Sequence, residues 1–176
     1  MAPDVREIPG KFLAGFRRRT SFVNDLTSEL WREFRLREGS IEGRVGSESY
    51  SVKVYDPGYS FANFDPAAEF EKWAAAEVSG PVDAFEFLAV PAGEYAVFTH
   101  KGTAAEAPRT FGHIFGQWLP NSSYMLDQRP HFEVLPQNYD PFDPESEEEI
   151  WIPIRNRSCY EGNRRTRIRP AGSDAA

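Results

Sequence analysis

The sequence predicts an α+β domain in which an antiparallel sheet carries two main helices. In residues 21–37 and 108–120, apolar residues recur at three- and four-residue steps, which is typical of amphipathic helices. Several other segments alternate apolar with polar residues, the period of a half-buried strand. The order strand–helix–strand–strand occurs twice, so we predict a pseudo-twofold repeat with halves at about residues 6–80 and 85–154.

The first half contains one helix and one segment that is hard to assign. Ser21 or Asn24 can cap the helix N-terminus, and the helix runs to about Arg37. In residues 70–78 three consecutive alanines favour a helix, but the side chains alternate in character as they do along a strand. We assign a strand there on the alternation. The predicted strands of this half are residues 11–16, 50–55 and 70–78.

The second half contains the second helix. Pro108 suits a first helical turn, and the apolar residues from Phe111 to Leu119 lie on one helix face. Pro120 is expected to stop the helix because proline lacks a backbone N–H. The predicted strands of this half are residues 85–90, 94–101, 131–135 and 148–154.

Composition and charge limit the classes of protein to which the chain can belong. The 176 residues fit a single domain, at residues 1–154, followed by a tail. The chain has a net charge of −7, yet residues 155–176 contain six arginines against Glu161 and Asp174. An acidic body repels nucleic acid, so we expect no direct nucleic-acid binding by the main domain. The basic tail is expected to be a flexible, solvated end.

No segment looks like a membrane span or an export signal, so we expect a cytoplasmic protein. Cys159 is the one cysteine, which excludes an internal disulfide and fits a reducing compartment. His100, His113 and His131 lack the spacing of metal ligands. The sequence also lacks a phosphate-binding glycine loop. We therefore predict neither a metal nor a cofactor.

Two charged runs have simple explanations. Glu145 and residues 147–149 are expected to form a solvated acidic lead into a strand. Residues 17–19, three consecutive arginines, are expected to lie at a solvated strand end.

Six segments form an ordered set along the chain: LWREF at 30–34, WAAAEV at 73–78, PAGEYAVFTHKG at 91–102, WLP at 118–120, FE at 132–133 and EIWIPI at 149–154. In this order and spacing they resemble the GyrI-like small-molecule-binding domain, the effector-binding module of some AraC-type and multidrug-responsive regulators. The likeness covers roughly residues 6–154. The family's regulators carry a helix-turn-helix domain, and no segment here is free to form one. We therefore expect a stand-alone binding domain, of the kind also found in mobile gene cassettes and gyrase-inhibitory proteins.

The resemblance implies a ligand groove between the two halves. Family members bind organic cations there, and the glutamate that aligns with Glu133 faces the charge among aromatic rings. A buried carboxylate can select cations because an unpaired buried charge is costly to desolvate. Without the resemblance, Glu133 would be interpreted as a surface residue of a half-exposed strand, on one face with His131 and Leu135.

Aromatic side chains are the candidates to surround Glu133, because tryptophan offers the best ring face to a cation. Trp31 and Trp118 occupy loosely corresponding places on the two helices, although core packing explains them equally well. Trp151 faces away from the aliphatic layer of its strand, and Trp73 shares a strand face with two glutamates. The candidate ligand site consists of Glu133 with Trp31, Trp73, Trp118, Trp151, Tyr50 and Tyr95.

Three functions compete at this stage. The first is a non-catalytic binder of amphipathic organic cations, such as drugs or dyes, that acts as a sensor or by sequestration. The second is a protein-interaction module that inhibits gyrase or partners a separate DNA-binding regulator, with the basic tail as its best feature. The third is a hydrolase of reactive small molecules that uses Glu133 with Tyr95 or Tyr50, as some relatives do. We favour the binder and expect no catalytic residues.

Overall fold

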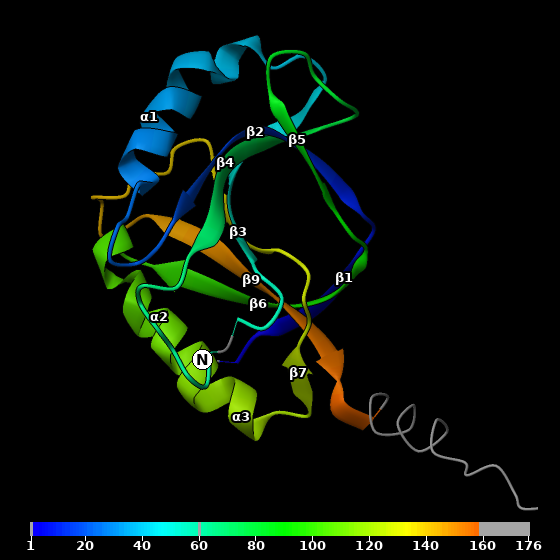
Figure 1. Cartoon of the computed structure of the whole chain (residues 1–176), viewed down its shortest axis with the longest axis vertical. Coiled ribbons are helices and arrows are strands. Elements are labelled where there is room, and N and C mark those ends of the chain that lie inside the picture. Colours follow the sequence, from blue (N-terminus) through cyan, green and yellow to red (C-terminus); the bar gives the residue numbers. More distant parts are fainter. Residues whose placement is uncertain (1, 60, 159–176) are drawn as a thin grey trace, which may run out of the picture.

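A nine-stranded antiparallel sheet forms the centre of the molecule, as the computed structural model of residues 2–59 and 61–158 shows (Figure 1). The strand order is β1-β6-β9-β8-β3-β4-β2-β5, and β7 pairs with β9. The strands are β1 (Asp4–Ile8), β2 (Lys11–Thr20), β3 (Arg44–Tyr55), β4 (Phe70–Val78), β5 (Glu86–Val90), β6 (Gly93–Lys101), β7 (Tyr124–Leu126), β8 (His131–Leu135) and β9 (Glu147–Asn156). The predicted α+β class, with an antiparallel sheet, is confirmed.

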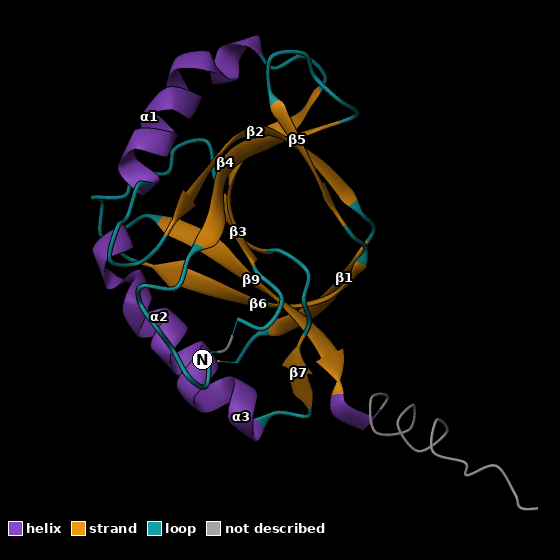
Figure 2. Cartoon of the chain, viewed as in Figure 1, coloured by secondary structure: helices purple, strands orange, loops and turns teal. Residues whose placement is uncertain are grey.

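Two helical regions follow β2 and β6 and lie on the same side of the curled sheet (Figure 2). The first is α1 (Thr27–Arg37), which continues into the 3-10 turn η1 (Glu38–Ser40). The second runs without interruption through η2 (Ala104–Glu106), α2 (Ala107–His113), the π-helical turn η3 (Ile114–Trp118) and α3 (Leu119–Asn121). None of the helices in the described residues is long and apolar enough to cross a membrane.

The sheet separates one apolar core from two others. Its inner face buries an aromatic-rich cluster that contains Trp73, Tyr95, Phe132 and Trp151. On its outer face, α1 packs against β2 and β4. The helical region around α2 packs against β6 and β9 in a separate cluster. The paired middle strands, β3 and β8, therefore lie between the two helical regions on the outer face.

The strand predicted for the ambiguous segment, residues 70–78, is confirmed. Residues 70–78 form β4, which pairs with both β2 and β3, so the alternation outweighed the helix preference of the three alanines. The predicted start of the first helix was wrong, because α1 begins at Thr27. The Thr20 hydroxyl donates to the Asn24 carbonyl at 2.6 Å and accepts from the Leu26 N–H at 3.0 Å. These bonds hold the preceding residues in a compact turn instead of a helix.

The second helical region also departs from the prediction. It ends at Asn121, one residue after Pro120, where the prediction had placed the stop at the proline itself. Strands β1 and β7 were not predicted. Strand β9 extends to Asn156, so Arg155 belongs to the sheet, and the rest of the predicted basic tail lies outside the described residues after Ser158. The twofold repeat stays a prediction.

Candidate ligand-binding site

Glu133 lies near the middle of the outer sheet face, between the two helical regions. It sits on β8 opposite Ser51 of β3 on one side and opposite Ile150 of β9 on the other. Because side chains alternate along a strand, Ser51 and Lys53 of β3 point to the same face as Glu133. The sheet therefore brings polar groups from three strands into the strip that the helices flank.

Two lysines and a serine meet the Glu133 carboxylate. Lys53 forms an ion pair with it, and Lys72 of β4 lies 3.7 Å from its other oxygen. The Ser51 hydroxyl donates to the carboxylate at 2.5 Å and accepts from the Lys72 ammonium at 2.6 Å. The three charged side chains are only 6–13% exposed. The carboxylate is thus compensated within the chain, which a buried charge requires.

The charged groups of this cluster shift one another's pKa values. Burial opposes ionisation of Glu133, but the charges of Lys53 and Lys72 prevail and lower its pKa to about 2. Burial lowers the pKa of Lys72 to about 8, although Glu133 acts in the opposite direction. At neutral pH Glu133 is therefore a carboxylate, and Lys72 is still mainly an ammonium group.

Aromatic side chains cover this cluster on the side of the second helical region. Phe111 of α2 lies under the Lys53 ammonium, 4.6 Å from nitrogen to ring centre. Phe115 stacks on Phe61 at 4.2 Å between ring centres, and the Phe61 ring also lies 5.5 Å from that of His131. Burial lowers the pKa of His131 to about 3, so this ring is neutral at physiological pH. A carboxylate between ring faces and a neutral imidazole is an arrangement that suits an organic cation.

A small cavity lies at the centre of these groups. Its lining includes Lys53, Tyr55, Phe115, His131 and Glu133. The volume is about 10 Å³, which is space for one water molecule. We call the strip of the outer face around this cavity the groove; the chain's own side chains fill it, and none of its described lining residues belongs to α1.

A second carboxylate lies behind the first. Glu148 of β9 is buried, so the prediction that the whole acidic run is solvated was wrong at this position. Burial raises the pKa of Glu148, and the negative charge of Glu133 adds to the effect. Glu148 hydrogen-bonds Tyr139 from the loop before β9. The arginines at 17–19 lie exposed near the end of β2, as predicted, and each forms a surface ion pair with an acidic side chain.

Four of the predicted site aromatics lie on the other face of the sheet from Glu133. Tyr50, Trp73, Tyr95 and Trp151 belong to the inner core. Trp151 borders the small cavity, but its ring stacks on Phe132 at 5.3 Å inside that core. The structure therefore does not bring these rings onto the carboxylate, because their side chains point to the opposite face of the sheet from Glu133.

The remaining two tryptophans lie on the outer face, and each packs against the apolar cluster beneath one helical region. Trp31 of α1 packs edge-on against Phe34, with the Arg35 guanidinium 5.0 Å from the centre of its ring. Trp118 packs edge-on against Phe98 and stacks on Tyr124. Among the described residues that line the cavity, neither tryptophan is found.

The sequence analysis missed the lysines and the phenylalanines of the groove. A signal for the lysines existed, since Lys53 and Lys72 each interrupt a buried strand face, where an unpaired ammonium is too costly. No comparable signal marks Phe61, because it lies in the loop between β3 and β4.

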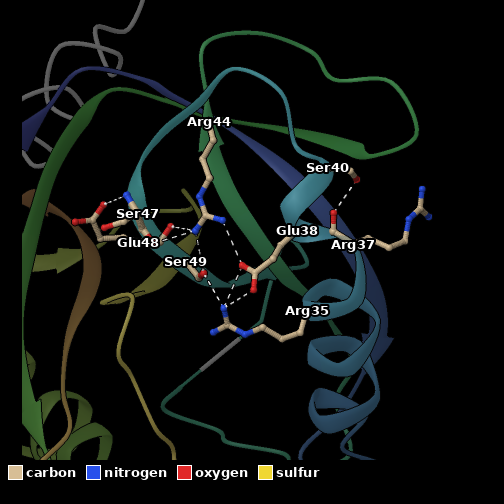
Figure 3. A network of polar contacts seen from close by, with 8 residues as sticks. All are labelled: Arg35, Arg37, Glu38, Ser40, Arg44, Ser47, Glu48 and Ser49. Atoms are coloured by element: carbon tan, nitrogen blue, oxygen red, sulfur yellow. Dashed lines mark hydrogen bonds and ion pairs between the residues drawn. The ribbon is translucent and has the colours of Figure 1, made fainter.

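A polar network holds the end of α1 against β3 (Figure 3). The Glu38 carboxylate accepts from Arg35 at 2.9 Å and from Arg44 at 3.3 Å. Arg44 also donates to the carbonyl groups of Ser47 and Glu48, both at 3.0 Å. These bonds tie the helix end to the strand that supplies Ser51 and Lys53.

The fold and the groove define a small-molecule-binding domain, and comparison with known proteins identifies its family. The sequence profile of the GyrI-like small molecule binding domain matches residues 1–155. The chain belongs to this family.

Relatives share the sequence or the fold over most of the chain. The transcriptional regulator BrlR of Pseudomonas aeruginosa is 32% identical over 152 residues, which are 85% of this chain and 54% of BrlR. The chain therefore spans about half the length of this relative. The structure of SAV2435 bound to tetraphenylphosphonium has a TM-score of 0.66 and 12% identity over 88% of this chain and 94% of the other. An integron cassette protein of Vibrio cholerae has a TM-score of 0.61 and 18% identity, over 88% and 97%.

Proposed function

We propose that this domain binds amphipathic organic cations in the groove between its two helical regions, with Glu133 facing the positive charge. The observation that supports the proposal best is the place of the Lys53 ammonium. It lies between the Glu133 carboxylate and the face of Phe111, so a cation already occupies the space between acid and ring. A ligand cation would use the same partners. The tetraphenylphosphonium bound to SAV2435, a protein of the same fold, is a cation of the class proposed.

Two ions of the same shape and opposite charge provide the first test. Tetraphenylphosphonium and tetraphenylborate should be titrated into the protein by calorimetry. We expect binding of the phosphonium alone, because only a cation can face the carboxylate. Binding of the borate in preference to the phosphonium would contradict the proposal. So would the absence of binding by either ion.

A pair of phenylalanine variants tests the location. Phe115→Ala removes a ring of the groove and should weaken phosphonium binding about tenfold or more, since stacking on a cation contributes roughly 1–2 kcal/mol when desolvated. Phe142→Ala is the matched control, because Phe142 is 86% exposed and distant from the cavity lining. Equal affinities for the two variants would place the site elsewhere.

The role of such binding is part of the same proposal: the domain senses the cation for a partner or sequesters it. Because BrlR is a transcriptional regulator and this chain matches about half of it, we propose a DNA-binding regulator as the partner in the sensing case. Addition of tetraphenylphosphonium should then change the stability of that complex. Unchanged complex stability would favour sequestration.

The hydrolase alternative has less support. It requires a tyrosine beside Glu133, and Tyr50 and Tyr95 lie in the inner core instead. Tyr55 does line the cavity, but the ion pair with Lys53 occupies the carboxylate that would activate a water molecule.

A further inference from the structure

Two side chains of the groove occupy the positions that the proposed ligand would need. The small residual volume, about 10 Å³, is far below the roughly 300 Å³ at the lower end of ligand pockets. We propose, on the basis of the function proposed above, that the chain acts as its own ligand: Lys53 provides the cation and Phe61 the ring. An external ligand binds only by replacing both groups.

Lys53 matches the charged part of such a ligand. Its ammonium pairs with Glu133 on one side and lies 4.6 Å from the centre of the Phe111 ring on the other. Its long aliphatic stem can turn the ammonium toward water without a change in β3. The side chain is already 13% exposed, so the path to solvent is short.

Lys72 differs from Lys53 and is not replaceable in the same way. Its side chain is only 6% exposed, and its ammonium is held by the Ser51 hydroxyl at 2.6 Å. We therefore assign Lys72 to the fixed part of the site and Lys53 to the exchangeable part.

Phe61 matches the aromatic part. It is not itself among the described residues that line the cavity, but it covers two that are. Its ring is nearly parallel to that of Phe115, at 13°, and to that of His131, at 18°. Tyr55 meets it edge-on, with ring centres 5.0 Å apart. Aromatic neighbours of this kind are what a flat ligand ring would find in the same place. Phe61 belongs to a loop, so its removal from the groove breaks no strand pairing.

The proposed replacement of Lys53 and Phe61 by a ligand defines the ligand class more narrowly than "organic cation". If a monocation replaces Lys53, the charge of the buried cluster does not change, since Lys72 and Glu133 stay in place. A dication would leave an additional buried charge without a partner, and a neutral ring would leave Lys53 where it is. The structure thus assigns to the groove an aromatic monocation whose charge lies next to a ring.

Lys53 and Phe61 compete with an external ligand for the same place. The measured affinity is therefore the intrinsic affinity multiplied by the fraction of molecules whose groove is open. Removing an internal competitor should therefore tighten binding. We expect Phe61→Ala and Lys53→Met each to bind tetraphenylphosphonium about tenfold more tightly than the unmodified chain, and the double variant more tightly still. Phe64→Ala and Lys101→Met are matched controls. Phe64 lies in the same loop but packs on Phe22, and Lys101 forms an exposed ion pair outside the groove.

Phe61→Ala is the decisive variant, because it changes no charge, whereas Lys53→Met also removes a positive charge that repels cations. Tighter binding by Phe61→Ala, with Phe64→Ala unchanged, would support the self-ligand. Weaker or equal binding by Phe61→Ala would overturn it and make Phe61 part of the wall, while the proposed function would stand. Absence of phosphonium binding by all the variants would overturn the proposed function and this inference together.

Discussion

The pairing of Glu133 with two lysines makes a specific prediction about stability. Glu133→Gln keeps the size of the side chain and one acceptor oxygen but removes the charge. Lys53 and Lys72 would then be left as nearly buried ammonium groups without a counter-charge. Breaking a buried pair from one side costs about 3–5 kcal/mol. Because the glutamine oxygen can still accept from Lys53 and its amide group can donate to the Ser51 hydroxyl, we expect the lower end, about 3 kcal/mol.

Urea unfolding at pH 6, followed by tryptophan fluorescence, measures this loss, and thermal unfolding should show a fall of about 6–12 °C. Glu145→Gln is the matched control. It breaks a pair with Lys101 whose side chains are 75% and 51% exposed, so the free energy of unfolding should change by less than about 0.5 kcal/mol. If Glu133→Gln were as stable as the unmodified chain, the carboxylate would not be the counter-charge of the two lysines.

The pH dependence provides a second check on the same variant. The pKa of Glu133 is lowered from 4.5 to about 2 in the folded state, so its stabilising effect is complete above 4.5. The effect is lost as the pH falls through about 2, where the folded state also takes up the proton. The difference between the unmodified chain and Glu133→Gln should therefore shrink below pH 4.5. A constant difference across this range would contradict the assignment.

Two further predictions concern His131 and the close approach of β2 to β4. The pKa of His131 is lowered from 6.5 to about 3, so the unfolded chain binds this proton first, and stability falls with pH by about 2 kcal/mol between pH 6.5 and 5. His131→Gln should lack this loss in urea titrations, whereas His113→Gln should retain it. A Cβ at Gly15 would lie 2.6 Å from the Cα of Ala75, so Gly15→Ala should lose at least about 3 kcal/mol of unfolding free energy. Gly39→Ala, with nothing within 4 Å, should change it by less than about 0.5 kcal/mol.

The sequence predicted the sheet and the position of Glu133 because both follow from short-range patterns. Alternation along residues 70–78 and 131–135 assigns strands and also says which side chains share a face. This alternation predicted that Glu133 shares a sheet face with His131 and that Phe132 points to the opposite face. The family resemblance then gave the groove. These inferences need no knowledge of which strands are neighbours.

The aromatic surroundings of Glu133 could not be predicted because they depend on long-range pairing. Lys53 and Lys72 precede Glu133 by roughly 80 and 60 residues along the chain, and they meet it only because β8 pairs with β3 and β3 with β4. Tryptophans attracted attention by their residue type, whereas the cavity lining also includes Phe111 of α2, Phe115 of η3 and Tyr55 of β3, which the sequence analysis did not single out. Phe61 lies in a loop, and no periodic pattern places a loop side chain.

Lys53 is expected to stabilise the fold but to weaken cation binding. This opposition allows an experiment to distinguish a ligand site from an ion pair that serves only the fold. If the pair with Glu133 served stability alone, Lys53→Met would destabilise the chain and would raise cation affinity only as much as Lys72→Met, which removes the same charge. If the groove is a ligand site held closed by internal groups, Lys53→Met lowers the free energy of unfolding and raises affinity beyond that effect of charge. Lys72→Met should raise affinity less, since the Ser51 hydroxyl holds the Lys72 ammonium at 2.6 Å and only 6% of this side chain is exposed. The two lysines share one carboxylate, so the difference in affinity between the two variants reports which lysine a ligand replaces.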